Sequence, residues 1–305
     1  MSTSAVSASG LYRNFGDLVA VDNVSLDIEQ GTIFGFVGPN GSGKSTTIRM
    51  LCGLLTPSAG TATVLGHSLP KEAEHLRRRV GYMTQAFSLY RDLSVEENLD
   101  FVGQIYSMPR NKRKDRRDHW MGRLDLERYR HHLAGRLSGG QRQWLALAAC
   151  LLHRPEVLIL DEPTSQVDPK TRRDFWRILF ELADDGVTIL VSTHFMDEAE
   201  RCHRLGILDH GRLVTEGRPQ ALMQDLPVDV FRVSGPGLRD IEALLLQNTA
   251  VRSVVQIGDA LRVLTDQGTD PSTIATLADK GTHVERVDAN LEDVFVVATA
   301  DEVTA

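Results

Sequence analysis

One eight-residue stretch, "GPNGSGKS" from Gly38 to Ser45, has the residue types and spacing of a phosphate-binding loop. It lies between a predicted strand, "TIFGFVG", and a predicted helix that Pro57 prevents from continuing. Its backbone N–H groups can surround a β-phosphate, Lys44 can reach the β- and γ-phosphate oxygens, and the Ser45 hydroxyl can hold Mg²⁺. A glycine-rich turn that matches by accident is the alternative, and the flanking strand and helix favour the phosphate loop.

A second stretch, "VLILDE", ends in two adjacent carboxylates, Asp161 and Glu162. The apolar run predicts a strand that delivers both carboxylates to its carboxyl end, where ligands bind in open α/β sheets. Asp161 suits Mg²⁺ coordination through water, and Glu162 can accept a proton from attacking water. The two carboxylates could instead be solvated or cap the next helix, but a phosphate loop in the same chain favours a site.

Three further side chains are candidates for the same site only because the two motifs above are present. Gln85, in "GYMTQ", could sense Mg²⁺ or the attacking water through its amide. His194 follows the strand pattern "VTILVS" and could reach the γ-phosphate at the same sheet edge. Phe15 could stack on an adenine ring. Each has a common alternative, namely a surface glutamine without a role, an incidental histidine among the 10 in the chain, and a core aromatic residue.

The stretch "LSGGQ", from Leu137 to Gln141, places a serine and two glycines before a long apolar-periodic run. In one interpretation Ser138 caps a helix and the glycines only turn the chain. In the other, the bare N–H groups of the helix start form an anion site. The phosphate-handling motifs elsewhere in the chain favour the second interpretation.

The apolar pattern predicts an α/β fold. The runs at 157–160 and 187–192 suit central strands that helices cover on both faces. Between them, a helix is expected from near Asp168 to Gly186, and strand–helix–strand alternation predicts a mostly parallel sheet. A half-buried strand is expected from Val24 to Glu29.

Two other regions have different patterns. Residues 84–135 are mostly helical in pattern, and the composition changes near Pro227. After that point the order is β-α-β-β-α-β, the ferredoxin-like pattern. The expected elements are a strand at 230–234, a helix at 238–247, a hairpin turning at Gly258–Asp259, a helix at 271–280 and a strand from His283. We therefore predict a domain at 1–226 with a helical subdomain at about 86–140, and a small C-terminal α+β accessory domain at 227–305.

Composition indicates an ordinary globular protein. Of the 305 residues, 42% are hydrophobic and 25% charged, and the net charge of -7 gives no general reason to expect nucleic-acid binding. Cys52, Cys150 and Cys202 are odd in number and widely spaced, which fits a reducing compartment. No signal-peptide pattern and no apolar run of about 20 residues is present, so a membrane role is expected only through a partner.

The chain resembles the nucleotide-binding subunit of ATP-binding cassette (ABC) transporters over about residues 6–222. The matching pieces occur in the family's order: Phe15, the phosphate loop 38–46, Gln85, "LSGGQ", "VLILDE", "SQVD" and His194. The resemblance implies a P-loop NTPase fold of the ABC type. More narrowly, "DPKTRRDFW", "VSTHFMDEAERC" and "NLEDVF" resemble the ABC-2-type drug and antibiotic exporter branch, whose membrane half is a separate permease.

The resemblance also implies cofactors and site residues. ATP and Mg²⁺ are expected, with Glu162, His194, Gln85 and Lys44 in catalysis and Ser45, Gln85 and Asp161 at the metal. Two subunits are expected to pack head to tail, so that the "LSGGQ" of one faces the γ-phosphate held by the other. The residues expected to bind nucleotide are Phe15, Gly38, Pro39, Asn40, Gly41, Ser42, Gly43, Lys44, Ser45, Thr46, Ser138, Gly139, Gly140 and Gln141.

The implied partners are a second copy, or a related ATP-binding subunit, and an integral-membrane ABC-2-type permease. The chain is then expected in the cytoplasm, held at the cytoplasmic face of the membrane, where it energises export of a drug-like or lipophilic substrate. The segment 87–101 is the expected permease contact. The alternative is a non-transport ABC ATPase acting on nucleic acid or the ribosome. Because the chain shows neither coiled-coil heptads nor a second phosphate loop, no nucleic-acid partner is expected.

Two residues depart from the family pattern, and the roles of two further features stay open. Gln166 stands where a glycine or alanine is usual, and Trp144 where arginine is usual, which puts the rate and cooperativity of hydrolysis in doubt. Asp168 is expected to couple the two sites across the interface. The basic cluster at 109–119 could contact anionic lipid headgroups or the permease, but a solvated helix face is favoured because aspartates interrupt it.

Overall fold

The computed structural model describes residues 4–277 and 281–300 of the chain. It divides into two compact units, one ending at Glu216 and one beginning at Gly217. This division falls ten residues before the boundary expected from composition. The reason is α8 (Pro219–Gln224), which packs against α11 (Leu291–Ala300) of the second unit.

The first unit is built on a six-stranded sheet in the order β10-β9-β3-β8-β7-β6. The pairings β9-β3, β3-β8, β8-β7 and β7-β6 are all parallel. The predicted α/β class is therefore confirmed, and the apolar runs form β7 and β8 as expected. The strands are β3 (Ile33–Val37), β6 (Val80–Met83), β7 (Val157–Asp161), β8 (Thr188–Thr193), β9 (Arg204–Asp209) and β10 (Arg212–Gly217).

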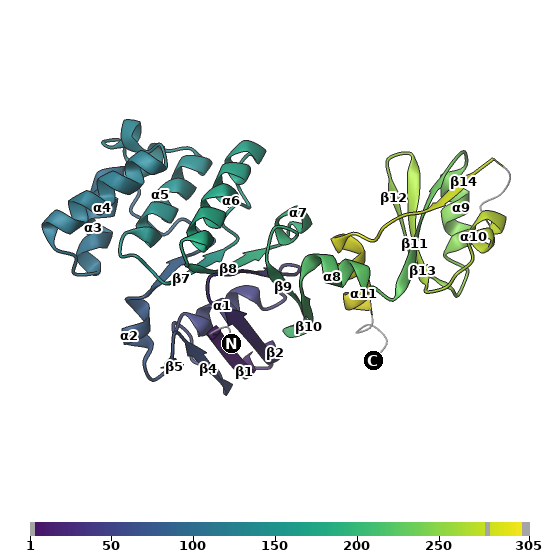
Figure 1. The fold of residues 1–305 in the computed structure, drawn as a ribbon, viewed down its shortest axis with the longest axis horizontal. Coiled ribbons are helices and arrows are strands. Elements are labelled where there is room, and N and C mark those ends of the chain that lie inside the picture. Colours follow the sequence, from purple (N-terminus) through teal and green to yellow (C-terminus); the bar gives the residue numbers. More distant parts are fainter. Residues whose placement is uncertain (1–3, 278–280, 301–305) are drawn as a thin grey trace. The chain divides into compact units, whose positions relative to one another are not determined.

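Helices cover both faces of this sheet because its central strands are apolar on both sides. In β7, Leu158 and Leu160 pack into the core beneath α5 and α6, whereas Val157 and Ile159 pack into the core that contains α1. Figure 1 shows α5 and α6 on one side of the sheet and α1 on the other. The helices are α1 (Lys44–Leu51), α5 (Gly139–Leu151), α6 (Pro169–Asp184) and the short α2 (Ala73–Arg77) and α7 (Met196–Ala199).

A second, four-stranded sheet in the order β2-β1-β4-β5 packs over α1. Its strand β2 begins at Leu18, six residues before the start predicted from the alternating pattern. The alternation is interrupted at Asn23, whose φ of 55° places it in the left-handed region. The strands are β1 (Ser4–Phe15), β2 (Leu18–Glu29), β4 (Ala59–Val64) and β5 (His67–Leu69).

The helical subdomain contains α3 (Val95–Ile105) and α4 (Arg110–Arg123), followed by the short 3₁₀ turns η1 (Glu127–Tyr129) and η2 (Ala134–Arg136). Ser94 begins α3 with a capping box formed with Glu97. Helix α4 holds most of the basic cluster, and its Arg117 is buried against Glu96, 2.8 Å away. The interpretation of this cluster as only a solvated helix face is therefore wrong for Arg117.

The second unit is a small α+β unit with a four-stranded antiparallel sheet in the order β12-β13-β11-β14. Each β-α-β connection skips one strand, which is the split arrangement. Helix α11 follows the sheet and was not expected from the sequence, and residues 278–280 of the expected helix lie outside the described residues. The elements are β11 (Val228–Ser234), α9 (Leu238–Leu245), β12 (Val251–Ile257), β13 (Ala260–Asp266), α10 (Pro271–Leu277) and β14 (His283–Arg286).

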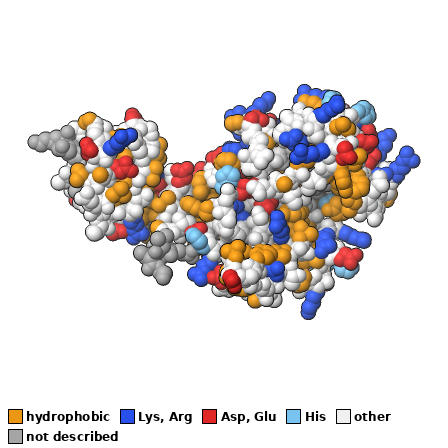
Figure 2. Space-filling model, turned by 180° about the vertical axis from the view of Figure 1, so that it is seen from behind, with side chains coloured by type: hydrophobic (Ala, Val, Ile, Leu, Met, Phe, Trp, Pro, Cys, Tyr) orange, Lys and Arg blue, Asp and Glu red, His pale blue; other side chains and the backbone are white. Residues whose placement is uncertain are grey.

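The surface of the first unit mixes apolar and basic groups, as Figure 2 shows by the hydrophobic side chains that lie beside Lys and Arg. On the helical subdomain, Tyr90 and Phe101 are 52% and 37% exposed, and their rings meet edge to face at 5.1 Å. An exposed aromatic pair of this kind is available to a partner.

Helix α6 provides a test of the core between it and the sheet. Trp176 is almost completely buried, whereas Phe180, one turn later, is 36% exposed. We expect Trp176→Ala to lower the free energy of unfolding by about 3–5 kcal/mol, because it leaves a large cavity. Phe180→Ala should cost about 1 kcal/mol or less. Urea unfolding followed by fluorescence of Trp120 and Trp144 measures both, and equal losses would contradict this packing.

Candidate functional site

The glycine-rich loop from Gly38 to Gly43 joins β3 to α1, so the N–H groups at the start of α1 face the space above the sheet edge. Gly43 has a φ of 97°, and a Cβ there would lie 2.5 Å from the carbonyl oxygen of Ala20. Only glycine fits this position. Ser42 is buried, and its hydroxyl has no hydrogen-bond partner among the described residues. The loop therefore has a free buried hydroxyl as well as free N–H groups.

Lys44, the first residue of α1, is buried and points back over the loop. Its ammonium donates hydrogen bonds to the carbonyl oxygens of Gly38 and Pro39, at 2.8 and 2.9 Å. It also lies 3.7 Å from a carboxylate oxygen of Glu162. Burial lowers the pKa of Lys44, and the charges of Glu162 and Asp161 oppose that shift. A phosphate could take the place of the two carbonyl groups as the partner of this ammonium.

Asp161 lies at the carboxyl end of β7, facing the first turn of α1. One of its oxygens accepts hydrogen bonds from Ser45 Oγ at 3.1 Å and from Ser192 Oγ at 2.7 Å. The hydroxyl of Ser45 and the carboxylate of Asp161 are oxygen donors of the kind that Mg²⁺ prefers. Two of the three predicted metal-site residues, Ser45 and Asp161, therefore lie together next to the phosphate loop, while Gln85 is hydrogen-bonded to the adjacent Glu162.

Glu162 is the centre of the site. It is 7% exposed, and its φ of 48° turns the chain sharply at the end of the strand. One carboxylate oxygen accepts a hydrogen bond from Gln85 Nε2 at 3.1 Å and lies 3.3 Å from His194 Nδ1, while the other faces Lys44. Four residues predicted separately along the sequence, Lys44, Gln85, Glu162 and His194, thus meet at one carboxylate.

Sequence reasoning missed Ser192. This residue is paired with Asp161 across β7 and β8. Its hydroxyl accepts a hydrogen bond from the backbone N–H of Glu162 at 2.9 Å and donates one to Asp161. It therefore fixes both acidic residues. Its place two residues before His194, at the end of a strand next to "VLILDE", is the signal that could have identified it.

Glu198 was also missed. It is 1% exposed and accepts hydrogen bonds from the hydroxyls of Thr164 and Thr193. It also lies 3.2 Å from Arg172, whose guanidinium covers the ring of Phe195. This network ties the residues that follow β7 to those that follow β8. A glutamate among other acidic residues in "MDEAE" gives no signal of burial.

Phe15 ends β1 at the turn into β2 and is 49% exposed. The guanidinium of Arg13 lies 4.8 Å from its ring centroid. The aromatic face is therefore not core, contrary to the common alternative. A flat ring could stack on the face opposite Arg13, or take the place of the Arg13 guanidinium.

The "LSGGQ" residues form the start of α5. Ser138 is the N-cap: its hydroxyl accepts from the N–H of Gln141, and the Gln141 side chain accepts from the N–H of Ser138. A Cβ on Gly139 would lie 3.2 Å from the carbonyl oxygen of Gln166, and one on Gly140 would lie 3.2 Å from the side chain of Thr171. The glycines are thus needed for close packing against the loop before α6, and the N–H groups of Gly139 and Gly140 remain at the helix start.

The structure locates Trp144 and Gln166, the two residues that depart from the family pattern. Trp144 is partly buried, and its ring lies 5.3 Å from that of Phe175 in the core under α6. Gln166 is exposed. Asp168, two residues later, caps α6 by accepting hydrogen bonds from the N–H groups of Lys170 and Thr171, and hydrogen bonds with Thr171 lower the pKa of Asp168. Neither departure contacts Lys44 or Glu162.

The site fits a nucleoside triphosphate. Three kinds of donor here would be satisfied by a triphosphate. They are the buried hydroxyl of Ser42, which has no partner among the described residues, the ammonium of Lys44, and the N–H groups at the start of α1. The oxygens of Ser45 and Asp161 fit a hard divalent cation.

Comparison with known proteins gives the same result. The family described as "ABC transporter" matches residues 21–165. A Nod factor export ATP-binding protein I from Ralstonia nicotianae is 37% identical over 306 residues, with 99% of this chain and 95% of the relative covered. The chain belongs to the ABC transporter family, as an ATP-binding protein.

Other relatives of this ABC protein agree. The probable multidrug ABC transporter ATP-binding protein YbhF from Escherichia coli is 44% identical over 219 residues, which is 72% of this chain but only 38% of the length of YbhF. A structure titled as a dimeric, post-hydrolysis state of the ATP-binding cassette MJ0796 bound to ADP and Pi matches with a TM-score of 0.65 and 29% identity, covering 70% of this chain and 98% of that one. The family and fold predicted from the motifs are confirmed, and the domain binds nucleotide. No helix among the described residues is long and apolar enough to cross a membrane.

The loop geometry gives a matched pair of glycine variants. Gly41 and Gly43 both have positive φ, but a Cβ on Gly41 would meet nothing within 4 Å. Gly41→Ala should cost about 1–2 kcal/mol of folding stability from backbone strain. Gly43→Ala should cost about 3 kcal/mol or more and abolish nucleotide binding, because it also meets Ala20. Urea unfolding and titration with a fluorescent ATP analogue measure both effects, and equal behaviour of the variants would contradict this loop conformation.

Proposed function

We propose that this chain hydrolyses ATP to ADP and phosphate and thereby energises export of a drug-like or lipophilic substrate through a separate ABC-2-type membrane permease. The observation that carries the proposal is the meeting of Lys44, Gln85 and His194 at the buried carboxylate of Glu162, next to the phosphate loop. The relatives reported above support transport, since one name refers to a multidrug transporter and the other to Nod factor export, and neither to nucleic acid or the ribosome.

The roles of the side chains follow from their positions. Lys44 exchanges its carbonyl partners for the β- and γ-phosphate oxygens, and Glu162 accepts the proton of the attacking water. Gln85 and His194 hold the Glu162 carboxylate from one side, so that its free lone pairs point to the water. Ser45, Asp161 and Gln85 would hold Mg²⁺, which when bound supplies positive charge for the transferred phosphoryl group.

The signature residues act on a second copy. The start of α5 presents N–H groups and the positive end of a helix of 13 residues. In a head-to-tail dimer, Ser138, Gly140 and Gln141 of one copy would face the γ-phosphate held by Lys44 of the other. The dimeric cassette structure bound to ADP and Pi supports this assembly. A related ATP-binding subunit could replace the second copy.

The permease contact lies on the helical subdomain. Closure of the dimer moves the segment after Gln85, because Gln85 is hydrogen-bonded to Glu162 and so follows the state of the nucleotide. Tyr90 and Phe101, within the segment 87–101, form the exposed aromatic pair that the permease would cover. The chain is therefore held at the cytoplasmic face of the membrane through that partner.

The catalytic role of Glu162 is tested by Glu162→Gln. Loss of the proton acceptor should lower the rate of ATP hydrolysis by about 100-fold or more, while ATP still binds. The variant should then elute as a dimer in ATP and Mg²⁺ and as a monomer in ADP, by size-exclusion chromatography. Glu181→Gln, which changes an exposed carboxylate paired with Arg123, is the control and should keep wild-type turnover. A strictly monomeric Glu162→Gln variant, or unchanged turnover, would contradict the proposal.

The permease contact has its own test. Affinity purification of the chain from detergent-solubilised membranes should recover an integral membrane protein. Phe101→Asp should reduce the recovered amount at least fivefold, because it places a charge in the apolar contact. Leu244→Asp, at an exposed apolar position of the second unit, should leave recovery unchanged. Equal recovery with both variants would place the contact elsewhere.

A further inference from the structure

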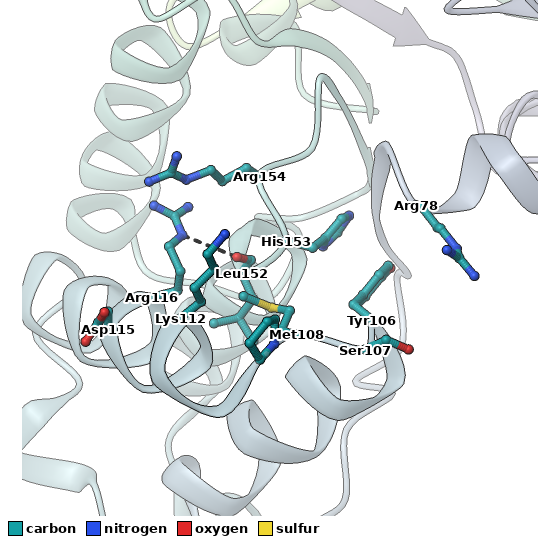
Figure 3. Close-up of a pocket in the computed structure, with 11 residues that line it drawn as sticks. Arg78, Tyr106, Ser107, Met108, Lys112, Asp115, Arg116, Leu152, His153 and Arg154 are labelled. Carbon is teal, nitrogen blue, oxygen red and sulfur yellow. Dashed lines mark hydrogen bonds between the residues drawn. The ribbon is translucent and has the colours of Figure 1, made fainter.

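A cavity of about 440 Å³ opens where α3 ends, α4 begins and α5 is followed by its connection to β7. None of its lining residues belongs to the nucleotide site. Its size is in the range of small-ligand pockets. Figure 3 shows the side chains that line it, with Tyr106 and His153 between the basic groups.

The lining carries an excess of positive charge. Arg78, Lys112, Arg116 and Arg154 line the cavity, and Asp115 is the single carboxylate in the lining. In Figure 3 the charged ends of Lys112, Arg116 and Arg154 point toward the same end of the cavity, and Asp115 points away from them. This arrangement leaves three cations without a carboxylate between them.

Other basic residues of α4 differ from the cations that line the cavity, because they form ion pairs. Arg113 lies 3.4 Å from Asp100, Arg117 lies 2.8 Å from Glu96, and Arg123 lies 2.7 Å from Glu181. Within residues 4–277 and 281–300, no carboxylate lies within ion-pair distance of any of the four cavity cations, Arg78, Lys112, Arg116 and Arg154. The basic residues of α4 that face α3 or α6 are thus paired, whereas Lys112 and Arg116, which line the cavity, have no carboxylate partner among the described residues. The exposed Arg110 and Lys114, outside the cavity, are unpaired as well within the same part of the chain.

Arg116 is held in place by the protein rather than by an anion. Its guanidinium donates hydrogen bonds to the carbonyl oxygens of Leu151 and Leu152, at 3.0 and 3.3 Å, at the end of α5. These two bonds orient the guanidinium in advance, and no described residue accepts a hydrogen bond from its remaining N–H groups. Burial lowers the pKa of Arg116, and the positive charge of Arg154 lowers it further.

The opposite wall is flat and aromatic. The rings of Tyr106 and His153 are stacked at 3.7 Å with an interplanar angle of 5°. A ligand with a phosphate at one end and an organic group at the other would match a cationic end and an apolar wall.

We propose that this cavity binds a phosphate-bearing anion, with the phosphate at Lys112, Arg116 and Arg154. The same chemistry could come from the headgroup of an anionic lipid or from a free phosphorylated molecule. Either would neutralise cations that the protein leaves unpaired. The site gives the basic cluster of α4 a binding role that is separate from ATP hydrolysis.

The experiment uses the full chain, saturated with ADP so that the phosphate loop is filled. Calorimetric titration with glycerol phosphate tests the free source. Co-sedimentation with phosphatidylcholine vesicles, with and without 30% phosphatidylglycerol, tests the lipid source. The test variant is Lys112→Gln combined with Arg154→Gln, and the matched control is Lys114→Gln, which removes an exposed charge from the same helix outside the cavity.

In at least one arm, the wild-type chain should bind and the double variant should bind about tenfold or more weakly, with the control within twofold of wild type. Binding of glycerol phosphate without preference for phosphatidylglycerol identifies a free ligand, and the reverse identifies a lipid headgroup. Weakening by 0.5 M NaCl is expected in both cases. Absence of binding in both arms, or an equal loss in the Lys114→Gln control, overturns the proposal, since Lys112, Arg116 and Arg154 then do not form an anion site.

Discussion

The burial of the Lys44 ammonium beside the Glu162 carboxylate is the constraint on which the site depends. The two side chains are 5% and 8% exposed and their charged atoms are 3.7 Å apart. Removing one partner of such a pair leaves the other charge buried and uncompensated, at a cost of about 3–5 kcal/mol. The protein therefore holds each group by further contacts. It does so with the carbonyl groups of Gly38 and Pro39 on one side and with Gln85 and His194 on the other. A triphosphate entering this space meets charges that are already oriented.

The sheet supplies that orientation. Parallel strands β3, β7 and β8 end at one edge, so the phosphate loop emerges beside the two carboxylates and His194, although Ser45 and Asp161 are 116 residues apart in sequence. Residues of β7 alternate between two cores, one under α5 and α6 and one around α1. Packing on both faces of the sheet fixes the position of the end of β7. It therefore fixes where the carboxylates of Asp161 and Glu162 lie.

Sequence reasoning predicts the structure correctly where a local residue pattern determines it. Continuous apolar runs predict β7 and β8, and the glycine spacing predicts the phosphate-binding loop. Sequence reasoning fails where contacts between distant residues determine the role of a side chain. Ser192 and Glu198 become important because distant residues contact them. The strand pattern before His194 could have identified Ser192, but the sequence around Glu198 indicates neither its burial nor its partners. The pairing of Arg117 with Glu96 likewise depends on how α3 and α4 pack, which the charge pattern of α4 alone does not reveal.

The central claim is that two copies share each nucleotide, with the start of α5 of one copy facing the phosphate loop of the other. Disulfide crosslinking tests it most directly, using a chain that carries Asn40→Cys and Ser138→Cys together with Glu162→Gln. Asn40 and Ser138 are both exposed, so each cysteine can react. The account predicts a covalent dimer on a non-reducing gel in ATP and Mg²⁺, and a monomer in ADP or with either cysteine alone. A chain that stays monomeric in ATP and Mg²⁺ would contradict it.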